Sequence, residues 1–173
     1  DRTLGALGAD TAAVLLLDAA ADRLVATSTR GLEEEVYQGV RIPLGRGFAG
    51  RIAATRRPIA IEDIDDAELF NPVLRDRGLR SLLGVPLMVG ERLLGVLHVG
   101  TLAPRRFTQA DIGLLQMAGD RVALTIHAHL ADDERKAAVA LQRSLLPDRL
   151  PDIAGLEAAL RYFTPHQWDD ERL

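Results

Sequence analysis

Cysteine is absent from the 173-residue sequence, and its absence excludes several kinds of chemistry. Without a thiol, the chain cannot form disulfides, bind a metal through thiolates, use a cysteine nucleophile or carry a cysteine-linked chromophore. Long apolar runs are missing as well: none approaches the roughly 20 residues that a membrane-spanning helix requires. The first residues also lack the pattern of a signal peptide. These absences suit a reducing compartment, and we expect a cytoplasmic protein.

Lysine is almost absent, since 20 of the 21 basic residues are arginine and only Lys136 is lysine. Together with abundant alanine, this bias indicates GC-rich codon usage rather than an arginine-based site. The formal net charge is −4. The chain as a whole therefore offers no electrostatic case for binding nucleic acid or an anionic membrane. We expect neither as a partner.

What the sequence does contain is enough apolar residues, 47%, to bury the core of one domain or of one domain with an extension. Short apolar or alternating segments predict strands at 12–18, 24–30, 81–88 and 92–101. The last two are joined by a three-residue hairpin loop, so the sheet should be largely antiparallel. The pattern predicts an α+β fold, with terminal helices on one face of the sheet and the middle segments on the other.

A long helix is predicted near the C-terminal end. Thr108 and Asp111 have capping-box spacing at its start, and Pro147 stops it. Its apolar stripe consists of Ile112, Leu115, Ala118, Val122, Ile126 and Leu130. A helix of this length is too long for one small domain to cover. Its far half is expected to pack on a partner helix or to act as a rod between domains.

The segment from Arg41 to Asp66 predicts a short strand, a glycine loop, a short helix over 48–55 and a second strand over 58–61. Its GRGFAG run has the spacing of a dinucleotide-binding loop. That fingerprint requires a β-α-β unit with a long helix, whereas the helix here is short. We interpret the glycines as residues that permit tight turns and close packing, with nucleotide binding as the alternative.

Taken together, four segments resemble a GAF domain, the small-molecule sensor relative of the PAS fold, over about residues 4–131. They are AAVLLLD at 12–18, IPLGRGFAGRIAATRRPIAIEDI at 42–64, SLLGVPLMVGERLLGVLHVG at 81–100 and FTQADIGLLQMAGDRVALTI at 107–126. The resemblance implies a sheet of five to six strands and a parallel homodimer formed by the terminal helices. It also implies a ligand pocket on the opposite face, walled by the middle segments.

The candidate residues for that pocket are nearly all apolar: Phe48, Ile59, Ile61, Phe70, Leu74, Leu79, Ser81 and Leu83. Such a wall fits a hydrophobic or weakly polar small molecule, or side chains that pack with no ligand. Cyclic-nucleotide-binding members of the family carry a motif of which only Phe107 and Asp111 are matched here. We therefore do not predict cyclic GMP, and we interpret this pair as a packing residue and a helix-start acid.

A second resemblance follows the long helix. LQRSLLPDRLPDIAGLEAALRYFTP, at 141–165, is similar to the entry into bacterial serine phosphatases of the PPM class, the sporulation-stage-II-E and sigma-regulator types. It divides the chain into a sensor domain at 1–131, a helical linker at 132–147 and the beginning of an incomplete phosphatase at 148–173. Manganese or magnesium would be bound only by the absent phosphatase core. Asp169 and Asp170 lack the family's preceding glycines, so we assign them no metal.

No catalytic residue and no metal site is predicted in this chain. His127 and His129 lie two apart on a helix and do not share a face. His98 lies in an apolar strand, facing either the pocket or the helices, and we interpret it as a core histidine rather than a ligand. Ser81 has no convincing base partner. The acids between Glu62 and Glu68 are interpreted as a solvated loop, with a cation site or lid as the alternative.

These observations predict a sensor domain that dimerises and controls an attached protein serine/threonine phosphatase in a signalling pathway of the anti-sigma-antagonist type. One alternative is a dimerisation module that has no ligand, and another is a phosphatase fragment with residual catalysis. If the helix stripe forms the dimer, Val122→Glu or Ile126→Glu should produce monomers or destabilise the fold.

Overall fold

A single antiparallel sheet organises the computed structural model, which describes residues 2–66 and 71–145. Its six strands are β1 (Thr11–Asp18), β2 (Arg23–Arg30), β3 (Arg41–Pro43), β4 (Ile59–Ile61), β5 (Ser81–Val89) and β6 (Arg92–Thr101). They lie in the order β3-β2-β1-β6-β5-β4, and every neighbouring pair is antiparallel. The predicted α+β fold and its sheet are thereby confirmed.

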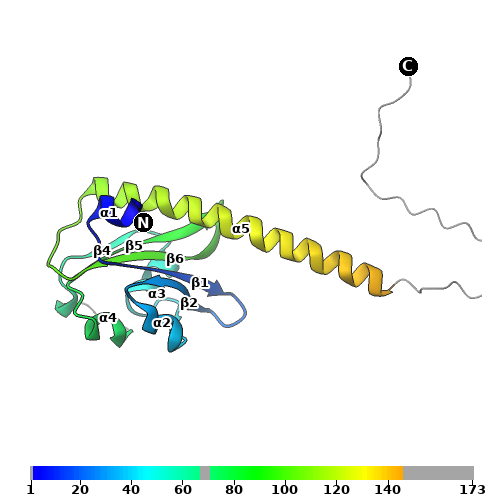
Figure 1. The fold of residues 1–173 in the computed structure, drawn as a ribbon, viewed down its shortest axis with the longest axis horizontal. Coiled ribbons are helices and arrows are strands. Elements are labelled where there is room, and N and C mark those ends of the chain that lie inside the picture. Colours follow the sequence, from blue (N-terminus) through cyan, green and yellow to red (C-terminus); the bar gives the residue numbers. More distant parts are fainter. Residues whose placement is uncertain (1, 67–70, 146–173) are drawn as a thin grey trace, which may run out of the picture. The chain divides into compact units, whose positions relative to one another are not determined.

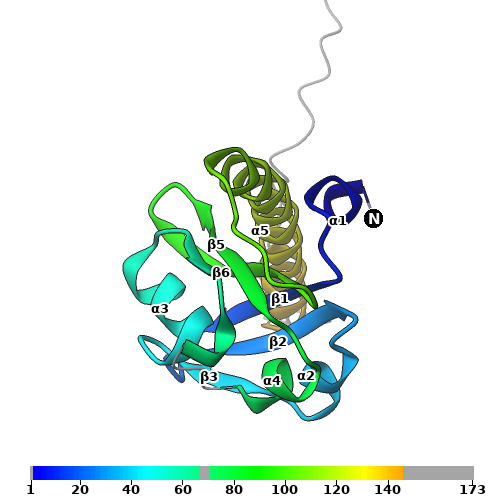
Figure 2. The same cartoon turned by 90° about the vertical axis from the view of Figure 1, so that its left-hand side faces the viewer.

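Helices cover both faces of this sheet (Figures 1 and 2). On one face lie α1 (Arg2–Leu7) and α5 (Gln109–Leu145). On the other lie α2 (Glu33–Tyr37), α3 (Gly47–Thr55) and α4 (Pro72–Asp76), and the 3-10 turn η1 (Ile64–Asp66) follows β4. The placement of the terminal helices on one face agrees with the prediction. Among the described residues, the compact unit ends at Arg135, and the part of α5 from Lys136 onward belongs to a separate unit.

Alternation along the strands gives the domain two apolar cores, one on each face of the sheet. In β6, Val96 belongs to the cluster beneath α2, α3 and α4, while Leu97 and Val99 belong to the cluster beneath α1 and α5. Each cluster is filled mainly by aliphatic side chains. The sheet is therefore buried on both faces, and neighbouring residues of one strand belong to different cores.

Helix α5 begins as predicted. The Thr108 hydroxyl accepts a hydrogen bond from the Asp111 N–H at 3.2 Å, and an Asp111 carboxylate oxygen accepts from the Thr108 N–H at 2.8 Å. Leu115 and Ala123 are fully buried against the sheet. Phe107 is buried in the same core, which confirms its interpretation as a packing residue. Of the predicted apolar stripe, only Leu130 is exposed, at 41%.

The segment from β3 to β4 also forms as predicted, with β3, a glycine turn, α3 and β4 in that order. Gly45 and Gly47 have φ of 78° and 58°, values that favour glycine. A Cβ at Gly50 would come within 2.3 Å of the Pro43 carbonyl oxygen. The strands around this segment are antiparallel, so the β-α-β unit of a dinucleotide-binding loop is absent from the described residues. The glycines serve tight turns and close packing.

Candidate functional site

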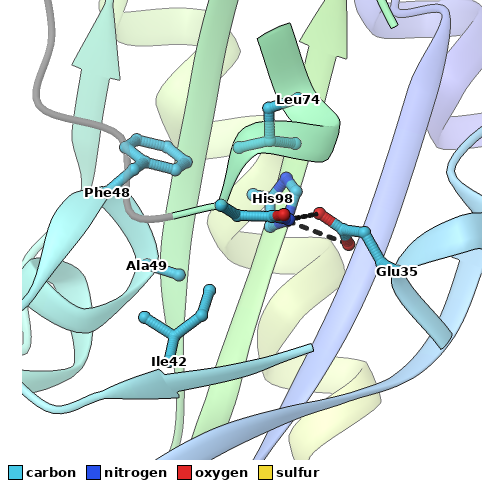
Figure 3. A pocket seen from close by; sticks show the side chains of 7 residues that line it. Glu35, Ile42, Phe48, Ala49, Leu74 and His98 are labelled. Carbon is cyan, nitrogen blue, oxygen red and sulfur yellow. Dashed lines mark hydrogen bonds and ion pairs between the residues drawn. The ribbon is translucent and has the colours of Figure 1, made fainter. Parts of the chain in front are cut away.

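A small cavity lies between the sheet and the three helices of the middle segments (Figure 3). The residues that line it come from five elements or their ends: Glu35, Ile42, Phe48, Ala49, Asn71, Leu74 and His98. It leaves about 10 Å³ for the centre of a water-sized sphere, which is room for about one water molecule. The site is therefore small, mostly apolar, and carries three polar side chains.

Glu35 is the acid of this site and is 0% exposed. It lies in α2, whose single turn projects Glu33 outward while Glu35 points to the sheet. One carboxyl oxygen, Oε1, accepts a hydrogen bond from Asn71 Nδ2 at 2.5 Å. The Asn71 Oδ1 accepts from the Val73 N–H at 3.1 Å, which caps α4. Asn71 therefore joins the start of α4 to the buried acid, and both sides of its amide are in use.

His98 brings an imidazole to the same cavity from β6 and is 1% exposed. Its Nε2 lies 3.9 Å from Glu35 Oε2, close for two titratable groups but too long for a hydrogen bond. Among the residues that the structure describes, neither Glu35 Oε2 nor His98 Nδ1 has a hydrogen-bond partner. The site therefore holds two buried polar atoms whose hydrogen-bonding capacity is unused.

Glycine on the neighbouring strand makes room for this arrangement. Gly84 of β5 is paired with His98, and a Cβ at Gly84 would approach Ile52 Cδ1 to 2.5 Å and Phe48 Cζ to 3.0 Å. Phe48 packs nearly perpendicular to the imidazole, with ring centroids 5.9 Å apart. The absent side chain at Gly84 lets α3 bring Phe48 down to the sheet and close one side of the cavity.

Burial controls the protonation of both groups. It raises the pKa of Glu35 from 4.5 to about 7, against the opposing effect of the Asn71 hydrogen bond. Burial also lowers the pKa of His98 from 6.5 to about 4. Between these values the favoured state has a protonated Glu35 and a neutral imidazole. Near neutral pH the cavity gains one negative charge as Glu35 loses its proton.

The predicted pocket residues fall into five groups. Phe48 and Leu74 line the cavity, whereas Ile59, Ile61 and Leu79 belong to the same apolar core without lining it. Ser81 is buried, but its hydroxyl donates to the Glu62 carbonyl at 2.6 Å and accepts from the Arg105 N–H at 2.7 Å. Leu83 belongs to the core beneath α5, so its predicted place in the pocket is corrected. Phe70 lies outside the described residues.

Sequence reasoning missed Glu35 and Asn71. Three adjacent glutamates are typical of a solvent-facing helical turn, yet the Glu35 carboxyl of α2 is fully buried. Asn71-Pro72 has the local pattern of a helix start, which it forms at α4, and that pattern gives no sign of the contact with Glu35. One signal in the sequence was available. Adjacent residues of a helix point about 100° apart, so residues 33, 34 and 35 cannot all face solvent, and one of them must face the sheet.

The acidic run after β4 is used in ion pairs. Asp63 and Asp65 each contact Arg80, at 3.2 and 3.1 Å, and Glu62 pairs with Arg106 at 3.0 Å. Within residues 2–66 and 71–145, no group of three or more histidine, aspartate or glutamate side chains could hold a metal ion. In the same ranges, no helix is both long and apolar enough to cross a membrane.

The fold and the site define a class: a single-sheet α+β domain with a small, mostly apolar cavity on one face and a long helix on the other. The chain belongs to the GAF domain family, whose model matches residues 2–126. The solved GAF domain of a phosphoenolpyruvate-protein phosphotransferase (ptsP) from Coxiella burnetii is similar in fold. Its TM-score is 0.69 at 24% identity, over 77% of this chain and 80% of that one.

Two curated relatives are longer proteins. The HTH-type transcriptional activator RamA of Corynebacterium glutamicum is 29% identical over 155 residues, which is 87% of this chain and 50% of RamA. The Nif-specific regulatory protein of Herbaspirillum seropedicae is 27% identical over 150 residues, 78% of this chain and 27% of the relative. The chain thus spans half or less of these relatives. GAF domains are regulatory sensor domains in signalling proteins of this kind.

Proposed function

We propose that the chain is a cytoplasmic regulatory domain that binds a small molecule in the Glu35–His98 cavity and passes its state to an attached effector through α5. One observation carries the proposal: a buried carboxyl oxygen, Glu35 Oε2, has no hydrogen-bond partner among the described residues and borders a cavity on the sheet face opposite α5. Burying such a group costs free energy that a bound donor would recover. A ligand can act only through different affinities for two arrangements of the domain.

The proposed effector is a protein serine/threonine phosphatase of the PPM class. Its support is the resemblance at 141–165, most of which lies outside the described residues. The helix that would connect the cavity domain to it is α5, which continues as a helix to Leu145. We propose no catalytic residue within the sensor domain itself.

Thermal unfolding in the presence of the small-molecule fraction of a bacterial extract tests ligand binding. A ligand that binds only the folded state raises the melting temperature. At a ligand concentration of about one hundred times Kd, the free energy of unfolding increases by about 2.7 kcal/mol. Ala49→Val adds two methyl groups at the cavity wall and is expected to abolish the shift. Ala54→Val makes the same substitution at an exposed position of α3, and this variant should still show the ligand-induced rise in melting temperature. If no extract fraction raises the melting temperature of the unaltered protein, the proposed binding is wrong.

Helix α5 also favours a homodimer, the second part of the proposal. Met117 and Leu124 are 59% and 62% exposed, and they lie seven residues apart on the side of α5 away from the sheet. Val122 and Ile126, in contrast, pack into the sheet core. Of the two outcomes predicted for glutamate at these positions, their packing favours destabilisation of the fold, so neither variant can report on dimerisation separately.

Leu124→Glu is expected to convert a dimer to a monomer while leaving the free energy of unfolding of the monomer nearly unchanged. The side chain is exposed in the single chain, so only a partner would be affected by the new charge. Sedimentation velocity measures the change. Thr125→Glu lies about 100° around the helix from Leu124 and serves as the control. An unaltered protein that sediments as a monomer at all concentrations would remove the dimer proposal.

A further inference from the structure

Helix α3 carries a row of arginines with no acid near them in the sequence. Residues 42–61 contain four arginines and no other charged residue, so this stretch has a charge of +4 within a chain of −4. We call the four residues, Arg46, Arg51, Arg56 and Arg57, the arginine row. The preference for arginine over lysine in the whole chain explains which basic residue is used here. It does not explain why acids are missing from this stretch, since the rest of the chain carries −8.

The arginine row follows the length of α3 on the outside of the domain. Arg46 is the N-cap of the helix, Arg51 lies in its middle, and Arg56 and Arg57 follow its last residue. All four are exposed, whereas Phe48, on the inner side of the same helix, lines the cavity. The nine helical residues extend about 14 Å. Helix α5 lies on the other face of the sheet (Figure 2), so the row is remote from the proposed dimer surface.

Within the described part of the chain, no carboxylate neutralises the arginine row. Its four guanidinium groups form no ion pair there. The acids that follow β4 are already engaged, because Asp63 and Asp65 pair with Arg80 and Glu62 pairs with Arg106. Like charges gathered along one short helix repel each other, and this repulsion weakens the isolated domain. An anionic partner would relieve it.

Two members of the row occupy positions that local structure disfavours for arginine. Arg56 has a φ of 55°, in the left-handed region where glycine or asparagine is less strained. Arg46 forms no side-chain cap hydrogen bond, and its positive charge stands at the positive end of the helix dipole. Neither residue benefits the isolated fold through its local position. Local costs of this kind are typical of residues that serve binding.

The chemistry of the surface favours the carboxylates of a polypeptide over nucleic acid or a membrane. A guanidinium group binds a carboxylate through two parallel N–H···O bonds. In residues 42–61 the one aromatic residue, Phe48, is buried, so no ring can stack on bases. The exposed apolar residues of the stretch are only alanine, proline and glycine, which are too small to insert into a bilayer. A long polyanion would also extend beyond the row over a surface of net negative charge.

We propose that the arginine row is a docking surface for an acidic segment of a partner protein, whose carboxylates pair with the guanidinium groups. Members of the row five residues apart are about 7.5 Å apart along the helix axis. An extended segment with acids at alternate residues spaces its carboxylates by about 6.8 Å on one side, which is a close match. The row lies outside the cavity, so this proposal goes beyond the proposed function and does not depend on a cavity ligand.

Fluorescence anisotropy of the full chain with two short labelled peptides tests the proposal. One peptide alternates glutamate with serine, and the other has glutamine in place of every glutamate. The glutamate peptide should bind saturably at low ionic strength and lose affinity as NaCl is added, because exposed charge pairs are screened by salt. The glutamine peptide should not bind.

A combined Arg46→Gln, Arg51→Gln and Arg57→Gln variant should bind the glutamate peptide about tenfold more weakly or worse, since several exposed ion pairs of modest strength are lost together. The three side chains are exposed, so the fold should be kept. Circular dichroism and the melting temperature would confirm this.

The matched control removes three other exposed arginines. Arg92→Gln, Arg121→Gln and Arg135→Gln combined change the net charge by the same amount, at the β5–β6 hairpin and along α5. This variant should bind the glutamate peptide like the unaltered protein. Equal losses in the two triple variants would mean that only the net charge of the chain matters, and the docking surface would be wrong.

Arg56→Gly separates binding from folding. Glycine adopts the left-handed backbone without strain, so the melting temperature should rise. Affinity for the glutamate peptide should nevertheless fall, by about two- to fivefold, because one ion pair is lost. An Arg56 side chain that serves only the fold would give the reverse result, a lower melting temperature with unchanged binding.

Three further outcomes would overturn the inference. The first is the absence of glutamate-peptide binding at low ionic strength, and the second is equal binding of the glutamine peptide. The third is tighter binding of a single-stranded oligonucleotide or of phosphatidylserine vesicles than of the glutamate peptide, which would assign the row to another class of partner. None of these results bears on the cavity, which the extract experiment tests separately.

Discussion

The Glu35→Gln variant is expected to gain about 3 kcal/mol of stability relative to the unaltered protein as the pH rises from about 4.5 to about 7. Burial raises the pKa of Glu35 above its unfolded value of 4.5, so the folded state holds the proton more tightly. Stability from this group is fully present below pH 4.5 and is lost as the pH rises through about 7. Glutamine does not titrate, so the variant escapes this loss.

His98→Asn should gain stability relative to the unaltered protein as the pH falls, whereas Glu35→Gln gains it as the pH rises. Burial lowers the pKa of His98 from 6.5 to about 4, so the unfolded state binds the proton more tightly. In the unaltered protein this group lowers stability as the pH falls from 6.5 towards 4. Removing the imidazole abolishes that loss, so the variant gains about 3 kcal/mol relative to the unaltered protein on acidification. Between pH 4.5 and 6.5 the two contributions oppose each other in the unaltered chain.

Urea unfolding at a series of pH values measures both differences, since other titrating groups are common to the compared proteins. Glu33→Gln is the control for the first variant. Backbone N–H groups of Glu33 and Gly31 lower the pKa of the exposed Glu33 carboxylate, so its removal should cost stability at higher pH. Parallel curves for the Glu35 variant and the unaltered protein would show that Glu35 is not titrating from a buried position.

Gly50→Ala is expected to destabilise the domain by about 3 kcal/mol, as overpacking of a tight site does. Gly50 lies inside α3, where alanine would by itself favour the helix by about 1 kcal/mol. The new Cβ, however, would lie 2.3 Å from the Pro43 carbonyl oxygen and 3.3 Å from Gly45 N. Both are backbone atoms of a turn closed by the Gly45 N–H to Gly50 carbonyl bond, so neither can move away easily.

Gly113→Ala is the matched control for this change. Gly113 is also helical, in α5, but a Cβ there would meet nothing within 4 Å. This variant should be stabilised by about 1 kcal/mol from helix propensity alone. Thermal or urea unfolding would report both. Equal behaviour of the two alanine variants would mean that α3 does not depend on close approach to the β3 turn.

The fold could be predicted well because its signals are local. Alternation at 92–101, the hairpin loop before it and the capping box of Thr108 and Asp111 each specify one element from adjacent residues. The order of those elements then allowed only an antiparallel sheet with helices on its faces. Terminal helices and the glycine turn at Gly45 and Gly47 were found where the pattern placed them.

The site was predicted only in part because its residues meet across long sequence distances. Phe48 and Leu74 were expected from their apolar character. The Asn71–Glu35 contact joins residues 36 apart, and no local pattern announces it. A glutamate within a run of three resembles a solvated helix face, since charged residues are rarely buried fully. Leu83 was misplaced because alternation determines the face only once the register of the strand is known.

Strand β6 presents the cavity group His98 and the helix-side residues Leu97 and Val99 at consecutive positions. Substitutions at every second residue can therefore change the side chains that face the cavity while the surface that supports α5 keeps its composition. A one-residue insertion in this strand, before His98, would exchange the two faces and place the imidazole on the helix side. The cavity lining and the surface that supports α5 can therefore change independently of each other by point substitution.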